Sequence, residues 1–480
     1  MTSLRGELLR LFALALLRLG ASWLIARAGI VALSDDDYAR IVIAQGFADA
    51  PKLDPSGTSW LPFPFWLMGS AMLVFGKGLE VARIAQACFA VLSVWLLYAG
   101  ARLFGMPTRT AFASAAFAAM LPLSLLLGVA TVPELPTAAL SAFALLAVTR
   151  PSSRTACLAG LAMLAATLSR YEAWPVAAVV ALFLLKDAGQ ALLPRPGAPA
   201  EGKGRANAVA ALAGATLALA GPVLWIAWNH HAHGHALHFL HRVSAYRQAL
   251  GVEAGAVGAY ILEVAQGSLT ALLPLLVVVP LASLTKPQVL APWKRPALAA
   301  LAVLAFLLVG DLVDGAPTHH PERTLLVAWL LAAMALPHLL QELRWPPLHV
   351  RGPAANAMVM GFAGLLAVGV LRDTHLAIEK PAQRHDEEAV GKLLQTLVPR
   401  GERVLIATDD YGYFAVMAAF GRPGDVIVDE THDPRLHRER SLLRDAESVA
   451  EKGVRFVVAT DLPASMKPMV KVGSFVLGAR

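Results

Sequence analysis

Charged residues are scarce in this sequence. Asp, Glu, Lys and Arg make up 16% of its 480 residues, whereas hydrophobic residues make up 57%. A soluble protein of this size would carry about a quarter charged residues. Apolar blocks such as 111–130, 207–228 and 324–340 are long enough to cross a hydrocarbon layer of about 30 Å. This composition excludes an ordinary soluble globular protein and predicts a polytopic α-helical membrane protein.

The sequence also lacks motifs for disulfides, metal binding, nucleic-acid binding and nucleotide binding. The two cysteines, Cys88 and Cys157, both lie inside apolar runs and form neither a disulfide framework nor a set of metal ligands. The net charge of +7 is spread over short loops, so nucleic acid is not predicted as a partner. There is no glycine-rich nucleotide fingerprint and no internal repeat. A nucleotide-dependent activity is therefore not expected.

Hydropathy predicts eleven transmembrane spans. They lie near residues 8–31, 80–104, 109–130, 132–149, 155–171, 172–188, 207–228, 263–285, 297–314, 323–341 and 355–371. The first span has features of a signal peptide, with Arg5, Arg10 and a possible cleavage sequence at 26–28. Arg18 and Arg27 interrupt its apolar core, which favours a retained span.

The predicted orientation of the chain across the membrane depends on whether the apolar segment 63–76 is counted as a span. It is too short to span a bilayer as a helix, which suits an interfacial or re-entrant segment. Without it, most Lys and Arg residues fall in the cytoplasmic loops; with it as a twelfth span, most fall outside, against the positive-inside tendency. We therefore expect a multi-pass protein of a bacterial inner or plasma membrane, with residues 32–79 and the C-terminal segment on the extracytoplasmic side.

The chain is predicted to have two domains. Residues 1–371 form the transmembrane domain with its large first outer loop, 32–79, and a Pro/Gly-rich cytoplasmic connector at 189–206. Residues 372–480 have the composition of a soluble protein. Their strand-like segments 403–408, 425–430 and 454–461 alternate with helical segments 414–420 and 440–453, so we predict an extracytoplasmic α/β domain.

Three adjacent carboxylates follow the first span. Asp35, Asp36 and Asp37 precede Tyr38 at the start of the outer loop. Repulsion among them should raise at least one pKa, which suits a general base or a site that binds hydroxyl groups or a metal. The alternative is a solvated helix N-terminus, because Asp before a helical sequence caps it well.

More ionisable residues recur at the predicted outer ends of spans. Together with Asp37 and Tyr38 of the first outer loop, they make up the candidate substrate-binding residues: Glu134, Arg170, Tyr171, Glu172, His320, Glu322 and Arg323. Each could be an ion pair or an interfacial anchor, but such residues at the edge of a bundle also line substrate cavities.

The segment 229–247 contains six histidines. It is predicted as a polar loop that lines a cavity, and the alternative is a metal site. No metal ligands and no cofactor are assigned, and a divalent cation is left open.

The order of these features resembles the GT-C glycosyltransferases that use polyprenyl-phosphate sugars. It is most similar to family 39, with the protein O-mannosyltransferases and the lipid A aminoarabinose transferases. The resemblance covers residues 8–341 and depends on the motifs DDDYA, SWLPFPFWLMG (59–69), FGKGLEVARIAQA (75–87), RLFGMPTRTA (102–111), PELP (133–136), SRYEAWP (169–175) and HPERTLL (320–326). The chain departs from the aminoarabinose transferases by having LPFP where they have Lys-Pro-Pro, so it lacks that lysine.

The resemblance implies a catalytic base in the first outer loop, with Asp35 and Asp36 the closest equivalents. The base would deprotonate an acceptor hydroxyl, which attacks the anomeric carbon with inversion and displaces a lipid phosphate. That leaving group needs a cation rather than a proton, and Arg323, Arg170 or Arg83 could provide it. The partners implied are a polyprenyl-phosphate sugar donor, the lipid bilayer, and a glycan, lipid or protein acceptor.

Two other functions fit a polytopic membrane protein. A transporter or lipid flippase would be expected to show broken helices at the midplane and pseudo-repeats, and the sequence shows neither. A non-catalytic scaffold or sensor built on the C-terminal domain would leave the outer acids and Arg323 without a purpose.

Overall fold

The computed structural model describes residues 4–192, 202–249, 268–312, 321–345, 353–378, 384–408, 410–429 and 453–480. Most of the chain is helical. The helices of the first half are α1 (Leu4–Arg27), α2 (Asp35–Asp49), α3 (Phe63–Phe75), α4 (Leu79–Phe104), α5 (Thr108–Ala119), α6 (Pro122–Leu127), α7 (Glu134–Ala147), α8 (Ser153–Thr167), α9 (Ala173–Leu192) and α10 (Gly202–His233). They continue with α11 (His238–Ala249), α13 (Leu269–Thr285), η1 (Pro287–Trp293), α14 (Lys294–Leu312), α15 (Pro321–Thr324), α16 (Leu326–Leu343) and α17 (Pro353–Ile378).

The bundle contains helices that can cross a bilayer. Seven helical segments within the described residues are long and apolar enough, namely those over Leu4–Arg27, Leu79–Phe104, Ala173–Leu192, Gly204–His233, Pro287–Gly310, Leu326–Leu343 and Asn356–His375. Three shorter apolar helices, α3, α7 and α13, accompany them. The polytopic α-helical class is therefore confirmed, while the count of eleven spans stays a prediction.

One predicted span is not a single helix. Residues 109–130 form α5 and α6, which are separated at Leu121 because Pro122 cannot donate the backbone hydrogen bond that would continue α5. Arg18 of α1 lies fully buried beside this break. Its guanidinium donates to the carbonyls of Ala119 at 2.9 Å and Ser124 at 2.8 Å. The predicted span 109–130 therefore consists of two helices, and Arg18 binds carbonyls that the break leaves without helical partners.

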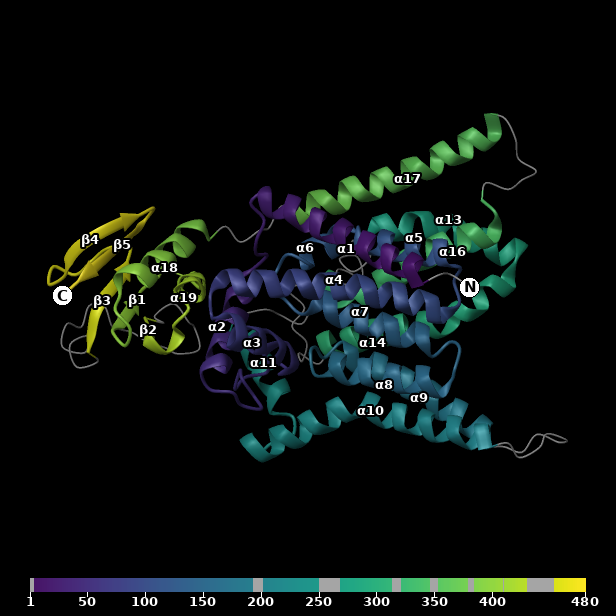
Figure 1. Cartoon of the computed structure of the whole chain (residues 1–480), viewed down its shortest axis with the longest axis horizontal. Coiled ribbons are helices and arrows are strands. Elements are labelled where there is room, and N and C mark those ends of the chain that lie inside the picture. The colour runs from purple at the N-terminus through teal and green to yellow at the C-terminus, as the bar shows by residue number, and fades with distance from the viewer. Residues whose placement is uncertain are drawn as a thin grey trace.

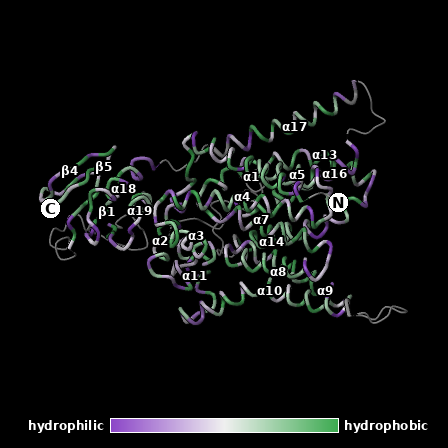
Figure 2. The backbone as a smooth tube through the Cα atoms, viewed as in Figure 1, coloured by the Kyte–Doolittle hydropathy of each residue, from purple (hydrophilic) through white to green (hydrophobic). Residues whose placement is uncertain are grey.

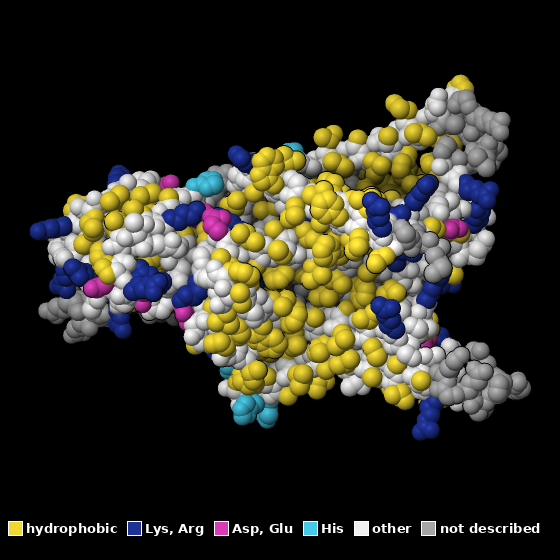
Figure 3. Space-filling view, viewed as in Figure 1, with side chains coloured by type: hydrophobic (Ala, Val, Ile, Leu, Met, Phe, Trp, Pro, Cys, Tyr) yellow, Lys and Arg dark blue, Asp and Glu magenta, His cyan; other side chains and the backbone are white. Residues whose placement is uncertain are grey.

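Apolar and polar surfaces are distributed unequally. Hydrophobic side chains cover most of the visible face of the bundle, whereas Lys and Arg gather on the C-terminal domain and at the opposite end of the bundle (Figures 2 and 3). A surface of this kind suits a protein whose middle section contacts lipid. Helices α2 and α3 lie at the same end as the C-terminal domain, and the N-terminus lies at the other end (Figure 1).

The C-terminal domain is a small α/β unit. It consists of α18 (His385–Leu397), β1 (Arg403–Ile406), α19 (Tyr413–Phe420), η2 (Pro423–Asp425), β2 (Val426–Val428), β3 (Val454–Ala459), β4 (Lys467–Val472) and β5 (Phe475–Ala479). The strand order is β2-β1-β3-β5-β4, with β1 parallel to β2 and β3, and β5 antiparallel to β3 and β4.

This arrangement confirms the predicted strands and the helix near 414–420. The β4–β5 hairpin was missed because its first strand, with Lys467, Pro468 and Lys471, lacks a hydrophobic alternation. The predicted helix at 440–453 and most of the connector at 189–206 lie outside the described residues.

The C-terminal domain packs directly on the first outer loop. Alanines 415, 418 and 419 of α19 share a hydrophobic cluster with Tyr38 and Ile41 of α2. Gln45 of α2 donates to the Ala418 carbonyl at 2.8 Å. Helix α2 therefore lies between the bundle and the α/β domain, and this position determines where its three aspartates point.

Candidate functional site

The three aspartates occupy the first turn of α2. Successive side chains on a helix point about 100° apart, so three neighbours face three different directions. Asp35 faces the C-terminal domain, where Arg384 donates from Nε and Nη2 to its two oxygens at 2.9 and 3.0 Å. A carboxylate held through both oxygens has little freedom to accept a proton from another molecule.

Asp37 faces the interior. Its side chain is 1% exposed and accepts hydrogen bonds from the backbone N–H groups of Leu33, Ser34 and Thr131 at 3.2, 3.1 and 2.7 Å. Burial raises the pKa of Asp37 to about 6, although these hydrogen bonds and Arg323 act in the opposite direction. The residue completes a capping box with Ser34 and ties α2 to the segment between α6 and α7.

Asp36 is the exposed member of the triplet. Its charge acts on the guanidinium groups of Arg40 and Arg170, so the three side chains belong to one electrostatic cluster. Asp36 is thus near enough to Arg40 and Arg170 for their charges to interact, while Asp35 and Asp37 are held by other groups.

An acidic and basic network lies beside Asp36. Arg170, in the turn between α8 and α9, donates to Glu134 Oε1 at 2.9 Å and from its Nε to Glu172. Burial acts to lower the pKa of Arg170, but the two carboxylates outweigh it, so this pKa is raised and the arginine stays charged. The second oxygen of Glu134 is buried and has no hydrogen-bond partner among the described residues.

Arg40, one turn after Asp36 on α2, was not singled out from the sequence. Its guanidinium lies over the Trp60 ring, 4.4 Å from the ring centre, and its buried Nε has no hydrogen-bond partner within the described part of the chain. Burial lowers its pKa from the ordinary value, with Glu134 and Asp36 opposing. A buried donor without a partner is costly, so it is expected where a ligand is to be bound.

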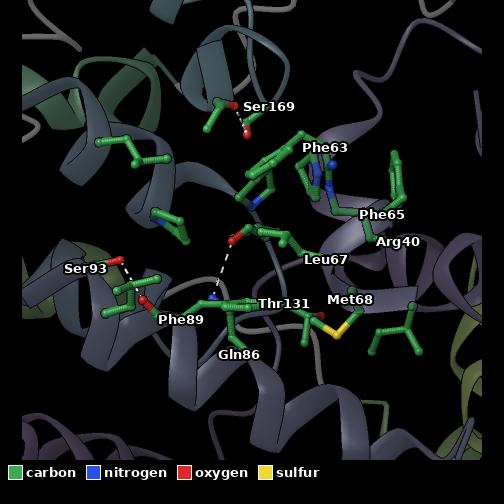
Figure 4. Close-up of a pocket in the computed structure, with 18 of the residues that line it drawn as sticks. Arg40, Phe63, Phe65, Leu67, Met68, Gln86, Phe89, Ser93, Thr131 and Ser169 are labelled. Atoms are coloured by element: carbon green, nitrogen blue, oxygen red, sulfur yellow. Dashed lines mark hydrogen bonds between the residues drawn. The ribbon is translucent and has the colours of Figure 1, made fainter. Parts of the chain in front are cut away.

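Arg40 lines a cavity of about 220 Å³ between α2, α3, α4 and α7. Arg40, Phe63 and Phe65 lie on one side of it, and Phe89 and Ser93 lie on the other (Figure 4). Away from Arg40 its walls are almost entirely apolar and include Leu92, Leu96 and Leu140.

The cavity borders the surface of the bundle at some of its apolar lining residues. The lining residues Leu67 and Leu92 are 40% and 49% exposed, so the cavity reaches the surface of the bundle. A single cation at one end of an apolar channel is suited to a lipid with a negatively charged head group.

Tyr38 and Tyr171, which the sequence predicted to bind substrate, form hydrogen bonds between different parts of the fold. Tyr38 is 1% exposed and donates to Glu388 of the C-terminal domain at 2.7 Å. Tyr171 donates to the Ser59 carbonyl at 2.5 Å and accepts from Trp225. They therefore anchor the C-terminal domain and the loop before α3, respectively.

The segment 320–323 is described in part. His320 lies outside the described residues, and Glu322 belongs to the short helix α15. Arg323 is 9% exposed and near enough to Asp37 and Glu134 for its charge to lower the pKa of Asp37. Glu134 and Arg323 thus lie around the start of α2, as expected for residues of a common site, whereas Asp35 faces away from them.

The histidine-rich segment is mostly helical rather than a long loop. Helix α10 continues through His233 and α11 starts at His238, so the connection between them is short. His233 stacks on His238 and His235 packs against His241, with ring centres 4.1 and 4.4 Å apart. The described residues contain no group of three or more His, Cys, Asp or Glu arranged to hold a metal ion.

Taken together, these features define a class of protein. The chain is a multi-pass membrane protein with an ionised cluster and an apolar cavity at the end of the bundle that carries an α/β domain. Comparison with known proteins extends this description. The family model of the dolichyl-phosphate-mannose-protein mannosyltransferases matches residues 55–199, which include α3, α4, α7 and the Glu134–Arg170–Glu172 network.

Solved structures share the fold over nearly the whole chain. ArnT from Cupriavidus metallidurans bound to undecaprenyl phosphate is 15% identical, with a TM-score of 0.56 over 99% of this chain and 98% of that one. Its apo state gives 14% identity and a TM-score of 0.54 over 100% and 98%.

The archaeal oligosaccharyltransferase AglB from Archaeoglobus fulgidus, in complex with an inhibitory peptide and a dolichol-phosphate, is 14% identical. Its TM-score is 0.51 over 94% of this chain and 69% of that one. The comparison with curated protein sequences finds no match. The chain therefore has the GT-C glycosyltransferase fold, and the resemblance indicated by its motifs is confirmed.

Some site residues could not be found from motifs. Arg40 carried one usable signal, its place four residues after Asp36, which puts the two on one helix face. Thr131 and Gln86 carried none, because they act through contacts distant in sequence. Gln86 donates to the carbonyls of Leu127 and Val132 at 3.2 and 3.4 Å and so fixes the segment from which Thr131 reaches Asp37.

Proposed function

We propose that this protein transfers a sugar from a polyprenyl-phosphate donor to an acceptor hydroxyl. The observation that carries the proposal is the apolar cavity, which Arg40 lines and which borders the bundle surface at Leu67 and Leu92. The buried Nε of Arg40 has no hydrogen-bond partner among the described residues. The GT-C fold supports it, and ArnT and AglB were solved with undecaprenyl phosphate and dolichol-phosphate, respectively.

Arg40 is proposed to hold the donor phosphate. Trp60 supports the guanidinium from one face, so the group is oriented before a ligand arrives. A guanidinium matches phosphate oxygens through two parallel N–H donors and stays charged even when partly buried. The isoprenoid chain would occupy the cavity lined by Leu92, Leu96 and Leu140.

Asp36 is proposed as the base. Asp35 is held by Arg384 and Asp37 by three backbone N–H groups, so Asp36 is the member of the triplet whose carboxylate is open to an incoming hydroxyl. It would accept the hydroxyl proton while the acceptor oxygen bonds to the anomeric carbon and the bond from that carbon to the phosphate oxygen breaks. The electron pair of that bond leaves with the lipid phosphate, which Arg40 stabilises without protonation.

Glu134, Arg170 and Glu172 are proposed to bind the sugar. The second oxygen of Glu134, which has no hydrogen-bond partner among the described residues, can accept from a sugar hydroxyl, and Arg170 orients both carboxylates. Arg323, whose charge acts on both Asp37 and Glu134, stays a predicted contact to the substrate. The acceptor is proposed to approach from the side of Asp36.

The site and the C-terminal domain are proposed to be extracytoplasmic. The basis is the distribution of Lys and Arg among the loops. Single cysteines at the exposed positions Lys471 and Lys294, in a chain without Cys88 and Cys157, test the orientation. An impermeant thiol reagent should label the first and not the second in spheroplasts, and the reverse pattern would invert the topology.

The activity is tested with a panel of labelled polyprenyl-phosphate sugars. Purified protein in nanodiscs should transfer the label from at least one of them to a lipid, glycan or protein acceptor extracted from envelope membranes. Nucleotide sugars should give no transfer. If they support turnover as well as the lipid-linked sugars, the donor assignment is wrong. Flipping of the labelled lipid without sugar transfer would favour the transporter alternative.

A further inference from the structure

The C-terminal domain reaches the first turn of α2 through one arginine. Arg384, at the start of α18, holds both oxygens of Asp35. It is itself fixed by Glu387 at 3.0 Å and Asp410 at 2.8 Å. Burial acts to lower its pKa, but the surrounding carboxylates outweigh burial and raise the pKa of Arg384, so it remains charged. Helix α2 is thus attached at its first residue to the C-terminal domain.

A second attachment holds the opposite side of the same turn. Thr131 donates from its backbone N–H to Asp37 at 2.7 Å and from its hydroxyl to the Asp37 carbonyl at 3.0 Å. Asp35 and Asp37 are two residues apart, so they point in clearly different directions from the helix axis. Two fixed directions determine the rotation of the helix, and therefore the direction in which Asp36 points.

We propose that Arg384 is a positioning residue that sets the rotation of α2, so that the C-terminal domain directs Asp36 toward the cluster of Arg40 and Arg170. Arg384 touches neither the cavity nor any residue proposed to bind substrate, and it acts through Asp35. The catalytic part of this inference rests on the proposed function, whereas the structural part does not.

The chain contains a matched control for Arg384. Lys392 lies on the same helix, α18, and forms an ion pair across the same interface with Glu80 at 3.3 Å. This pair is exposed and involves α4 instead of α2, so its loss should have little effect. Arg384→Gln and Lys392→Gln therefore each remove one positive charge from the domain interface, but only the first releases α2.

Amide hydrogen exchange of the full chain in nanodiscs tests the structural part. Arg384→Gln and Asp35→Asn should each speed exchange in the first two turns of α2 by about tenfold, because the helix end opens locally. Lys392→Gln should leave it unchanged, and in all three variants exchange in β1 and β3 should stay as in the wild type. Equal exchange in α2 for Arg384→Gln and Lys392→Gln would overturn the proposal. Loss of protection in β1 and β3 with α2 unchanged would overturn it as well.

Steady-state kinetics with the labelled donor tests the catalytic part. Arg384→Gln should lower kcat by about fivefold or more through misplacement of Asp36, with little change in the KM of the donor. Arg384→Lys should recover part of kcat, since one ammonium cannot hold both carboxylate oxygens. Asp35→Asn combined with Arg384→Gln should cost no more than either change alone, because the two act as one unit. Additive losses, or a rise in KM alone, would exclude positioning.

If no donor supports turnover, the proposed function fails while the exchange experiment still decides whether Arg384 holds α2. If turnover is found and exchange in α2 does not depend on Arg384, the proposed function stands and this inference fails. The two ideas are therefore separated by experiment.

Discussion

Ionisable side chains lie on both sides of α2, but their hydrogen bonding differs between the two sides. Toward the C-terminal domain, Asp35 is paired with Arg384 and Tyr38 is bonded to Glu388, which Arg83 also binds at 2.5 Å. Toward the bundle, Arg40 and Glu134 each keep a buried polar atom without a partner among the described residues. Satisfied polar groups fix a structure, whereas unsatisfied ones carry a cost that a ligand can remove. This difference is the basis for our proposal that the first side holds the domains together and the second side binds substrate.

Asp36→Asn should have the largest effect. Removing the proposed base while keeping its shape should lower turnover by about 10²-fold or more, the usual share of general-base catalysis. Turnover is measured with the labelled donor, and donor binding is measured separately and should change little. Asp35→Asn is the comparison on the paired side and should reduce turnover far less. A larger loss for Asp35→Asn would reverse the assignment of the two sides.

Arg40→Ala should have the next largest effect. Arg40 is the only cation among the described residues that line the cavity, and its loss should weaken binding of undecaprenyl phosphate by about 10- to 100-fold, as for a charged partner left unpaired. Arg40→Lys should restore part of the affinity because it supplies charge without paired donors. Arg83→Gln, on the side of the C-terminal domain, should bind the lipid phosphate normally. Normal binding by Arg40→Ala would remove Arg40 from the donor site.

Asp37→Asn should affect stability more than chemistry. The amide would present an N–H group to backbone donors that now meet carboxylate oxygens, which should cost about 1–3 kcal/mol of unfolding free energy. Thermal unfolding in detergent measures this loss. Turnover of the folded variant per molecule should stay within about tenfold of the wild type, since the change removes no reacting group.

The pH dependence of the same variant sharpens this prediction. The pKa of Asp37 in the folded protein, about 6, lies above the value of about 4 expected in the unfolded chain. The folded state therefore holds this proton more tightly, and its stabilising contribution is lost as pH rises from about 4 to about 6. The wild type should lose stability relative to Asp37→Asn across that interval. A constant difference in Tm between pH 4 and pH 7 would contradict the assignment.

Tyr38→Phe should have the smallest effect. It removes one hydrogen bond to Glu388 on the paired side and leaves the ring packed against α19. We expect a loss of about 0.5–1.5 kcal/mol in unfolding free energy. Turnover should be unchanged, and a loss of turnover comparable with that of Asp36→Asn would place Tyr38 in the site instead.

Sequence reasoning recovered what periodicity and composition encode. Long apolar runs predicted the membrane helices, and alternating segments predicted β1, β2, β3 and α19. The break at Pro122 was missed because the apolar composition continues through it. The hairpin formed by β4 and β5 was missed because half of it is polar and contains Pro468.

The candidate site was predicted in part. The acidic triplet and the motifs around Glu134 and Arg170 marked one region, because ionisable groups beside apolar runs stand out. The different partners of Asp35, Asp36 and Asp37 could not be predicted. It depends on Arg384, some 350 residues away along the chain, and on the Thr131 backbone, which no side-chain pattern reveals. Arg40 was overlooked because what marks it is a buried Nε without a hydrogen-bond partner among the described residues, and the sequence does not show this.

Arg18 has a consequence for how the chain is made. It lies in the middle of the first membrane helix and pairs with no carboxylate among the described residues. Instead it donates to carbonyls of α5 and α6 that are synthesised about 100 residues later. An isolated arginine at the centre of a helix costs about 2.5–3.5 kcal/mol in insertion measurements. We therefore expect insertion of α1 to become more favourable once the α5–α6 break has been synthesised. A truncated chain that stops after α4 should insert α1 less efficiently than one that continues through α6.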